Sequence, residues 1–513
     1  MAELNGVYGE LCAKKRDAAT LSSISHLLGW DQETYMPKGG TAGRAEQASL
    51  MAGLIHERET SAALGDLISA CESDRDVQAD GDAAANVREM RRDYDKSTKL
   101  PGELVKELAN VGARAQDAWK SARKENDFKA FLPWLDTMMT LTRRKAECYG
   151  TPDGGELYDA LIDEYEADAR ASEIEAVFTP LRARLSDLVK NLLDNGTQPD
   201  LGPRTVRVAE AAQHAFGLKV IEQMGFDLNA GRLDTTTHPF CEGLAPGDTR
   251  LTTRYDEDYF MGALYGTMHE AGHGVYEQGL PKVGGDGEPT GLYGTPLTEA
   301  RSLGIHESQS RGWENFVGRG RSFWEWAKPI ADGFFGDEFK KYSVDDVYRA
   351  ANVVERSFIR VEADEATYNL HVMLRFGLER SLISGDLAVK DLPGEWNERF
   401  KEMMGADVPD DAHGCLQDVH WSFGLVGYFP TYTLGNLYAA QFFEAIREET
   451  PDLDARIGTG DMSAVLDWSR RHVHSLGRRW SASEMCEKAT GKALSAEPLM
   501  RHLERKLKAV YGV

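Results

Sequence analysis

Residues 269–273 read His-Glu-Ala-Gly-His, which places two histidines four positions apart with a glutamate directly after the first. An α-helix turns about once every 3.6 residues, so on a helix His269 and His273 lie on one face, where both imidazoles can reach one metal ion. Glu270 points beside that face, where it can hold a metal-bound water and take its proton. The pattern therefore predicts a helical zinc hydrolase site, with two histidine ligands and Glu270 as the general base.

The residues around this motif favour a helix over 256–279. Acidic residues at 256–258 suit the positive end of the helix dipole, and apolar residues follow at roughly helical spacing. Gly279 and Pro281 then supply a stop signal. A chance match of five residues is the alternative, and the helical context argues against it.

A catalytic zinc site also needs a third protein ligand and an open fourth position. The best candidate is Glu307, which lies in a helix that we expect to be opened by Pro-Leu-Thr at 296–298. His306 is the competing ligand, but adjacent helical residues point about 100° apart, so only one of the two can face the metal. Two histidines with a carboxylate form the common hydrolytic set, which favours Glu307. The structural alternative is an ordinary ion pair between Glu307 and Arg311.

Further motifs follow one another in a fixed order along the chain. They are Trp-Asp-Gln-Glu-Thr-Tyr-Met-Pro at 30–37, His-Pro-Phe at 238–240, Asp-Thr-Arg-Leu-Thr at 248–252, the motif at 269–273, His-Glu-Ser-Gln at 306–309, Ile-Arg-Val-Glu-Ala-Asp at 359–364 and Gly-Cys-Leu-Gln-Asp-Val-His-Trp at 414–421. With this series, the chain resembles the carboxypeptidase Taq family of metallocarboxypeptidases over essentially its whole length. The resemblance implies His269, His273 and Glu307 as metal ligands and Glu270 as the general base.

The expected fold is mainly α, with a small β-sheet near the metal site. Amphipathic helices are predicted at 104–124, 343–385 and 437–447, and strand-like alternation is clearest at 232–255. No linker divides the chain, so we predict one catalytic domain over 1–513. The resemblance implies a large zincin-type fold whose two helical halves flank a deep groove, in a homodimer. The glycine-rich stretch at 282–291 is longer than the family usually shows, and we expect it to form a surface loop.

Peptide hydrolysis needs hydrogen-bond donors for the oxyanion that forms at the scissile carbonyl. A late histidine followed by a tyrosine serves this purpose in the related oligopeptidases and angiotensin-converting enzymes. By that analogy we predict His420 and Tyr432 as catalytic residues, with Tyr428 as the competing tyrosine near the substrate. The structural alternatives are a hydrogen-bonded core imidazole for His420 and aromatic packing for both tyrosines.

A carboxypeptidase also needs a cation for the carboxylate at the substrate's C-terminus, and an arginine can hold it through two hydrogen bonds. The resemblance suggests Arg360 for this role; its structural alternative is a helical ion pair with Asp364. Arg250 is the competing anchor, or else a structural partner of Asp248. His238 is predicted to line the same region, unless it is only a turn residue before a proline.

Composition limits the classes of partner. The chain has 513 residues with 83 acidic against 59 basic side chains, a formal charge of −24, which argues against nucleic acid as a ligand. The first residues contain no apolar signal segment, and no run of about 18 apolar residues predicts a membrane helix. Six cysteines lie scattered without paired spacing, which suits free thiols. Cys241 and Cys415 lie within or beside motifs, and we expect both to be packing residues. The cytoplasm is the predicted location.

These observations predict a metal-dependent carboxypeptidase that releases single amino acids from peptides with a free C-terminus, with broad specificity. One divalent ion is expected, Zn²⁺ first and Co²⁺ as the other candidate, with Glu270 assisting the attack of a metal-bound water. A zinc endo-oligopeptidase or a peptidyl-dipeptidase is the nearest alternative. A non-catalytic helical peptide-binding protein is the distant one, because a closed structural metal site has no use for Glu270.

Overall fold

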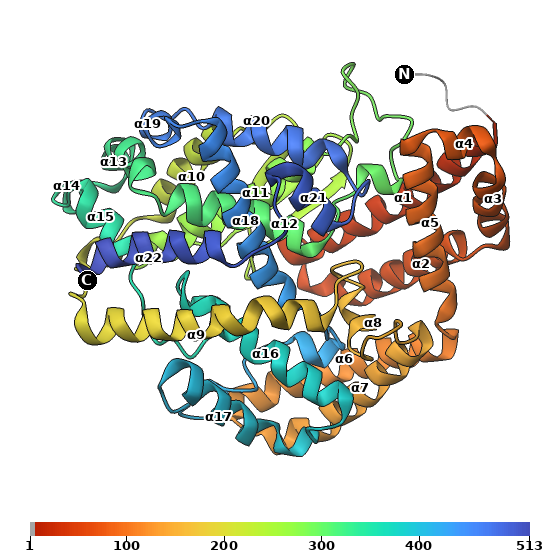
Figure 1. Ribbon diagram of the computed structural model, residues 1–513, viewed down its shortest axis with the longest axis horizontal. Coiled ribbons are helices and arrows are strands. Elements are labelled where there is room, and N and C mark those ends of the chain that lie inside the picture. Colours follow the sequence, from red (N-terminus) through yellow and green to blue (C-terminus); the bar gives the residue numbers. More distant parts are fainter. Residues whose placement is uncertain (1–5) are drawn as a thin grey trace. The chain divides into compact units, whose positions relative to one another are not determined.

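Helices dominate the computed structural model, which describes residues 6–513 and contains one small three-stranded sheet (Figure 1). The mainly α class predicted from the sequence is confirmed. The chain forms two compact units, each assembled from three separate segments. Unit 1 contains the chain up to Thr98, residues 200–351 and residues 439–493; unit 2 contains residues 99–199, 352–438 and 494–513. The single catalytic domain over 1–513 and the deep groove stay predictions.

Unit 1 holds the sheet and the helix that carries the His-Glu-Ala-Gly-His motif. Its helices are α1 (Gly6–Thr34), α2 (Thr41–Glu59), α3 (Ala62–Ser73), α4 (Arg75–Ala79), α5 (Gly81–Lys99), α10 (Glu210–Met224), α11 (Phe260–Gly279), α12 (Leu303–Arg311), α13 (Arg321–Phe335), α14 (Asp337–Lys340), α15 (Val344–Ala351), α19 (Leu453–Gly458), α20 (Ser463–His472) and α21 (Ala482–Thr490). Its strands are β1 (Gly231–Thr235), β2 (Cys241–Ala245) and β3 (Asp248–Thr253).

Unit 2 is built from long helices that lie side by side. They are α6 (Gly102–Glu125), α7 (Phe128–Tyr149), α8 (Asp159–Ile162), α9 (Ala171–Asn195), α16 (Thr367–Ser384), α17 (Leu392–Met404) and α22 (Glu497–Tyr511), and α18 (Pro430–Glu449) begins in unit 2 and ends in unit 1. Asn126 ends α6 in the left-handed conformation, and Asp127 caps the start of α7. This two-residue connection makes α6 and α7 neighbours. Helices α9 and α22 run side by side (Figure 1). Arg184 of α9 pairs there with Glu497 and Glu504 of α22.

The sheet has the strand order β1-β3-β2, with β1 parallel and β2 antiparallel to β3. It lies in the region where strand-like alternation was predicted, so that prediction is confirmed. Leu251 in β3 is fully buried, and the Thr267 hydroxyl of α11 donates to the Thr253 hydroxyl of β3 over 2.9 Å. These contacts place the sheet directly against the motif helix.

Helix α11 begins at Phe260, four residues later than predicted. The acidic residues before it form a turn instead, because the backbone N–H of Asp258 donates to the Asp256 carboxylate over 2.9 Å. Arg207 pairs with Glu257 and Asp258 and holds this turn outside the helix. The predicted end at Gly279 is confirmed.

Two other predicted helices differ from the structure, one in its start and one in its continuity. Pro296–Thr298 is a single 3-10 turn, and α12 starts only at Leu303, where the Ser302 hydroxyl accepts from the backbone N–H of Ile305 over 3.1 Å. The continuous helix predicted over 343–385 is wrong. It is interrupted at 352–366, because the Asp364 carboxylate accepts two backbone N–H groups and starts α16 anew.

Glycine allows α11 and α12 to cross in very close contact. A Cβ atom added to Gly272 would lie 2.6 Å from the Ser310 Cα and 2.7 Å from the Gln309 carbonyl oxygen, both in the α12 backbone. Real Cβ atoms do not approach backbone this closely, so any side chain at 272 would push the two helices apart. Gly272 therefore fixes the separation of the helices that carry the predicted metal ligands.

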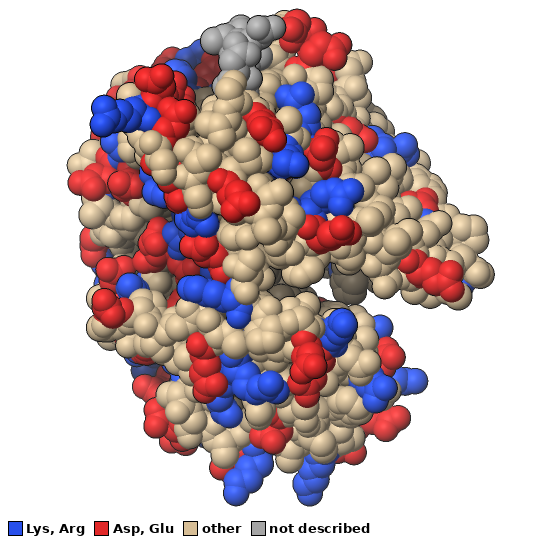
Figure 2. Space-filling model, turned by 90° about the vertical axis from the view of Figure 1, so that its right-hand side faces the viewer, with Lys and Arg blue, Asp and Glu red and all other residues tan. Residues whose placement is uncertain are grey.

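The glycine-rich stretch at 282–291 is a surface loop, as predicted. Val283 and Pro289 form a short antiparallel bridge, and most of the residues between them are exposed. Thr290 anchors its end, with its hydroxyl donating to the Pro281 carbonyl and its own carbonyl accepting from Arg16. Elsewhere on the surface, acidic and basic side chains are interspersed over the face drawn in Figure 2. Within residues 6–513, none of the helices combines the length and apolar character needed to span a bilayer.

We expect Gly272→Ala to destabilise unit 1 by about 1–3 kcal/mol, the range for overpacking a close contact. Gly266→Ala is the matched control, because Gly266 lies in the same helix and a Cβ there meets nothing within 4 Å. The control should be neutral or stabilising by up to about 1 kcal/mol, since alanine favours a helix over glycine. Denaturant unfolding of the two variants measures the difference. Equal stabilities would show that the helices can separate at no cost.

Candidate active site

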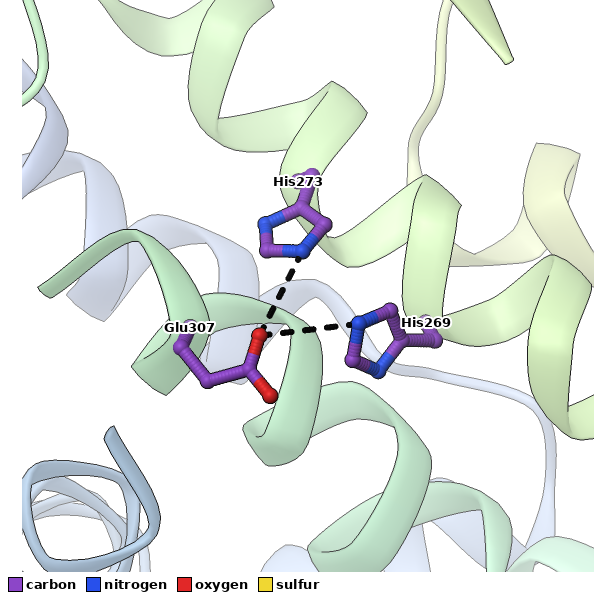
Figure 3. A group of neighbouring side chains, drawn as sticks. All are labelled: His269, His273 and Glu307. Atoms are coloured by element: carbon purple, nitrogen blue, oxygen red, sulfur yellow. Dashed lines mark ion pairs between the residues drawn. The ribbon is translucent and has the colours of Figure 1, made fainter. Parts of the chain in front are cut away.

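Three side chains from α11 and α12 meet in unit 1. His269 and His273 project from one face of α11 toward Glu307 on α12 (Figure 3). The Nε2 atom of each histidine lies 3.6 Å from Oε2 of Glu307, and ligand atoms of all three residues lie within 4.8 Å of one another. The structure thus brings together the three residues that the sequence predicted as one site.

The two carboxylate oxygens of Glu307 have different partners. Oε1 accepts a hydrogen bond from Nε of Arg311 over 2.6 Å, so the ion pair considered as the structural alternative is present. Oε2 faces the two histidines and also accepts from the Ser310 hydroxyl over 3.1 Å. The ion pair therefore fixes the carboxylate and leaves one oxygen directed at the histidines.

His306, the competing ligand, is directed elsewhere. Its Nε2 atom lies 3.0 Å from Oε1 of Glu277, and its ring stacks on the His273 ring with centroids 4.4 Å apart. The His306 ring therefore packs against the His273 ring and limits its rotation. The 100° between neighbouring helical residues separates Glu307 from His306, as expected.

The donor set fits a divalent metal ion. Ligand atoms about 2.0–2.2 Å from a tetrahedral ion lie about 3.3–3.6 Å from one another, close to the 3.6 Å separations between Glu307 and each histidine. Two imidazoles and one carboxylate are a set that catalytic zinc sites use, and three protein ligands leave one position open.

Glu270 lies beside this set and is only 8% exposed. Burial raises the pKa of its carboxyl to about 7, although the neighbouring His269 acts in the opposite direction. Its carboxylate makes no hydrogen bond or ion pair with the side chains and backbone of residues 6–513. No basic side chain in the described part of the chain holds this carboxylate, so it is free to accept a hydrogen bond or a proton from a group bound beside it.

Glu314 is a residue of this site that the sequence did not reveal. Its Oε2 atom lies 3.0 Å from Nδ1 of His269, and Arg311 and Arg319 donate to its two oxygens over 3.0 Å each. Burial by itself would raise its pKa, but Arg311 and the other partners outweigh burial and hold the pKa well below its usual range. Glu314 follows Glu307 by seven residues, a spacing that places two side chains on the same face of a helix. This spacing was the one signal in the sequence that could have indicated Glu314.

A second group of predicted residues comes together in unit 2, around Arg360. This side chain is 5% exposed; its Nε donates to the Asp418 carboxylate over 3.1 Å and its Nη1 donates to the Tyr368 hydroxyl over 3.0 Å. Fully buried Arg375 donates to the other oxygen of Asp418 over 2.6 Å. Asp364, the partner considered as the structural alternative, caps α16 instead. Two guanidinium groups thus share one carboxylate.

His420, Tyr428 and Tyr432 lie in the same group. The His420 and Tyr428 ring centroids are 5.4 Å apart, as are those of Tyr428 and Tyr432, and the Arg360 guanidinium lies 5.0 Å from the centre of the Tyr432 ring. Burial lowers the pKa of His420 to about 4, so its imidazole is neutral at pH 7 and carries one N–H donor.

The backbone that carries these rings is held by buried Glu379, which the sequence also did not reveal. Its carboxylate accepts hydrogen bonds from the Tyr158 hydroxyl over 2.6 Å, from Nε1 of Trp421 over 2.7 Å and from the backbone N–H of Gly427 over 3.0 Å. Trp421 and Gly427 lie at the two ends of the segment that joins His420 to Tyr428. Nothing in the local sequence around 379 predicts this role, because its partners come from distant segments.

The remaining predicted residues lie in unit 1, near the sheet. Arg250 donates to both oxygens of Asp248 over 2.9 Å and lies 4.2 Å from the centre of the Trp30 ring. The structural alternative for Arg250 is therefore present. His238 is exposed in the turn between β1 and β2. Burial raises the thiol pKa of Cys415, and a protonated buried thiol agrees with a packing residue.

Comparison with known proteins identifies the family. The model of the carboxypeptidase Taq (M32) metallopeptidases matches residues 10–507. The chain belongs to this M32 family. It is 44% identical to thermostable carboxypeptidase 1 of Thermus thermophilus, over 98% of this chain and 99% of the relative, and 35% identical to carboxypeptidase 1 of Bacillus subtilis, over 96% and 97%. Its structure matches an M32 carboxypeptidase from Deinococcus radiodurans R1 with a TM-score of 0.94 at 40% identity, covering 99% of this chain and 100% of the other.

As a member of M32, the protein is a metallocarboxypeptidase that acts on peptides, and the family implies a divalent metal ion. These statements confirm the predicted enzyme class and the predicted need for a metal. They argue against the non-catalytic peptide-binding protein.

We expect Asp418→Asn to destabilise the protein by about 3–5 kcal/mol, because it leaves Arg360 and Arg375 buried without a counter-charge. Asp194→Asn is the matched control, since Asp194 is exposed and pairs with Arg356 at 3.8 Å. Removing that surface charge should cost less than about 1 kcal/mol. Urea unfolding of both variants at pH 7 tests the difference, and equal losses would show that Arg360 and Arg375 do not depend on Asp418.

Proposed function

We propose that this M32 enzyme removes single amino acids from the free C-termini of peptides, with one divalent ion held by His269, His273 and Glu307. The observation that carries the proposal is the donor set, whose ligand atoms lie within 4.8 Å of one another beside the unengaged Glu270 carboxylate. Zinc is the ion that two imidazoles and one carboxylate suit best, and Co²⁺ accepts the same donors.

The chemistry follows from the groups around this donor set. A bound divalent ion supplies Lewis acidity, which lowers the pKa of a coordinated water and polarises the scissile carbonyl. Glu270 is proposed as the general base that takes the proton of the attacking water and passes it to the leaving amine. In this proposal Glu307 is held by Arg311 and His273 by the stacked His306, so the donors are fixed before substrate arrives.

Arg360 is proposed as the anchor for the terminal carboxylate of the substrate. Asp418 shares its single negative charge between Arg360 and Arg375, so this buried group carries one surplus positive charge. Arg250 is paired with Asp248 and has no second arginine sharing that carboxylate within residues 6–513, which supports Arg360 as the anchor. An anchor that recognises the carboxylate common to all C-terminal residues also supports broad specificity.

His420 and Tyr432 are proposed as donors to the oxyanion, with Tyr428 beside them. The neutral imidazole of His420 and a tyrosine hydroxyl are both able to donate a hydrogen bond to developing negative charge. Their place in one aromatic group with Arg360 supports a shared role in substrate binding. His238, exposed near the sheet, stays a predicted substrate contact. The homodimer and the cytoplasmic location stay predictions.

We expect Glu270→Gln to retain the metal and to lose about 100-fold to 10,000-fold in kcat for release of amino acids from an N-blocked peptide. The amide keeps the shape of the side chain but cannot take a proton. Metal content measured by mass spectrometry and amino-acid release measured in parallel test both parts. Glu325→Gln, at an exposed glutamate paired with Arg321, is the control and should change neither quantity. Unimpaired release would remove Glu270 from its role, and loss of the metal would make Glu270 a ligand.

Blocking the C-terminus of a substrate separates carboxypeptidase action from the alternatives. We expect amidation to abolish release of the terminal residue, because an amide gives Arg360 no carboxylate to hold. A chelator should abolish turnover of the free peptide, and added Zn²⁺ or Co²⁺ should restore it. Product analysis by mass spectrometry measures each result. Internal cleavage of the amidated peptide would support an endo-oligopeptidase, and release of dipeptides would support a peptidyl-dipeptidase.

A further inference from the structure

One face of the segment after Glu307 carries charges of alternating sign. In order along the chain they are Glu307, Arg311, Glu314 and Arg319. Arg311 bridges the two carboxylates, with its Nε donating to Glu307 over 2.6 Å and its Nη1 donating to Glu314 over 3.0 Å. Arg319 donates to the second oxygen of Glu314 over 3.0 Å. Each charge in this charge ladder therefore has an oppositely charged neighbour.

A π-helical turn, Gly312–Gly318, completes the charge ladder. The backbone N–H of Arg319 donates to the carbonyl of Glu314, five residues earlier, over 2.9 Å. On an α-helix, residues five positions apart point about 140° away from each other, so Arg319 would miss Glu314. The wider turn places the two side chains together. Turns of this kind are rare and frequently occur at functional sites.

Arg319 is itself fixed by three further contacts in unit 1. It donates to the Ala351 carbonyl over 2.8 Å and to the Asn315 side chain over 3.2 Å, and it lies 4.1 Å from the centre of the Tyr265 ring. Glu314 is thus held between two arginines that cannot move easily. The oxygen that accepts from Arg311, Oε2, also lies 3.0 Å from Nδ1 of His269.

From these contacts we infer that Glu314 is a positioning residue, which fixes the tautomer and ring orientation of His269 for metal binding. A carboxylate at Nδ1 keeps the proton on that nitrogen and leaves the lone pair of Nε2 directed at Glu307 and the ion. The negative charge of Glu314 also makes the imidazole a stronger donor. Nδ1 of His273 has no carboxylate partner within residues 6–513, so Glu314 orients His269 and not His273.

This inference rests on the proposed function, because it needs His269 to be a ligand. The test measures the dissociation constant of Zn²⁺ for the metal-free enzyme by competition with a chelator. We expect Glu314→Gln to weaken Zn²⁺ binding about 10-fold to 100-fold, as loss of such outer carboxylates does elsewhere. Glu325→Gln is the matched control, since the same change at an exposed position should leave the constant unaltered.

A readout on the histidine itself separates positioning from general damage. In ¹⁵N-histidine spectra of the metal-free enzyme, His269 should show the Nδ1–H tautomer in the wild type and a mixture of tautomers in Glu314→Gln. If uncompensated Arg319 prevents the single variant from folding, Glu314→Gln with Arg319→Gln removes one charge of each sign and should show the same loss of affinity.

The outcomes are distinguishable. A wild-type enzyme that binds no Zn²⁺ at these residues would overturn the proposed function itself. A wild type that binds Zn²⁺ while folded Glu314→Gln binds it within about 2-fold, with an unchanged His269 tautomer, would overturn the inference alone.

Discussion

The contact between α11 and α12 at Gly272 is the constraint on which the candidate site depends. Two imidazoles one turn apart on a helix can hold an ion only if a third donor approaches from outside that helix. Glu307 achieves this because the α12 backbone passes within van der Waals contact of position 272. The sheet completes the enclosure from another side, where Leu251 packs against the backbone of α11 at Gly274. Small residues on α11 thus set the distances in the site before any side-chain chemistry acts.

Both units contain a group of buried charged side chains, and the two groups favour ligands of opposite charge. Near the histidines, Glu307 and Glu314 are paired with two arginines, and Glu270 adds a carboxyl group that no arginine contacts within residues 6–513, so the surroundings favour a cation. Around Asp418, two arginines face one carboxylate, which leaves one surplus positive charge for an anion. Burying such groups costs several kcal/mol each unless partners compensate them, so surpluses of this kind are unfavourable without a ligand. A metal ion in unit 1 and a peptide carboxylate in unit 2 are ligands of the matching sign.

Three side chains outside the metal-ligand set lie where regular helix is interrupted. Glu314 stands in a π-helical turn, Arg360 begins a 3-10 turn, and His420 begins another at His420–Phe423. At two of these places a buried polar group contacts the irregular segment: Gln417 accepts from the backbone N–H of Arg360 over 2.8 Å, and Glu379 accepts from the Trp421 side chain over 2.7 Å. At such interruptions a side chain can point in a direction that a regular helix does not allow. The buried hydrogen-bond partners then hold it in that one direction.

The mainly α class, the motif helix with its end at Gly279, and the strand region before it could be predicted from the amino-acid sequence. So could the pairing of His269 with His273, because all of these follow from periodicities within one segment. The sequence also favoured Glu307 over His306 as the third ligand. The structure adds that the His306 imidazole contacts Glu277 instead. The break at 352–366, the partner of Arg360 and the contacts of Glu314 and Glu379 became visible only in the folded chain. The break combines a local cap at Asp364 with hydrogen bonds to distant Gln417, and the other features depend on distant partners or on a turn of unusual width. Contacts of this kind leave no periodic pattern in the amino-acid sequence.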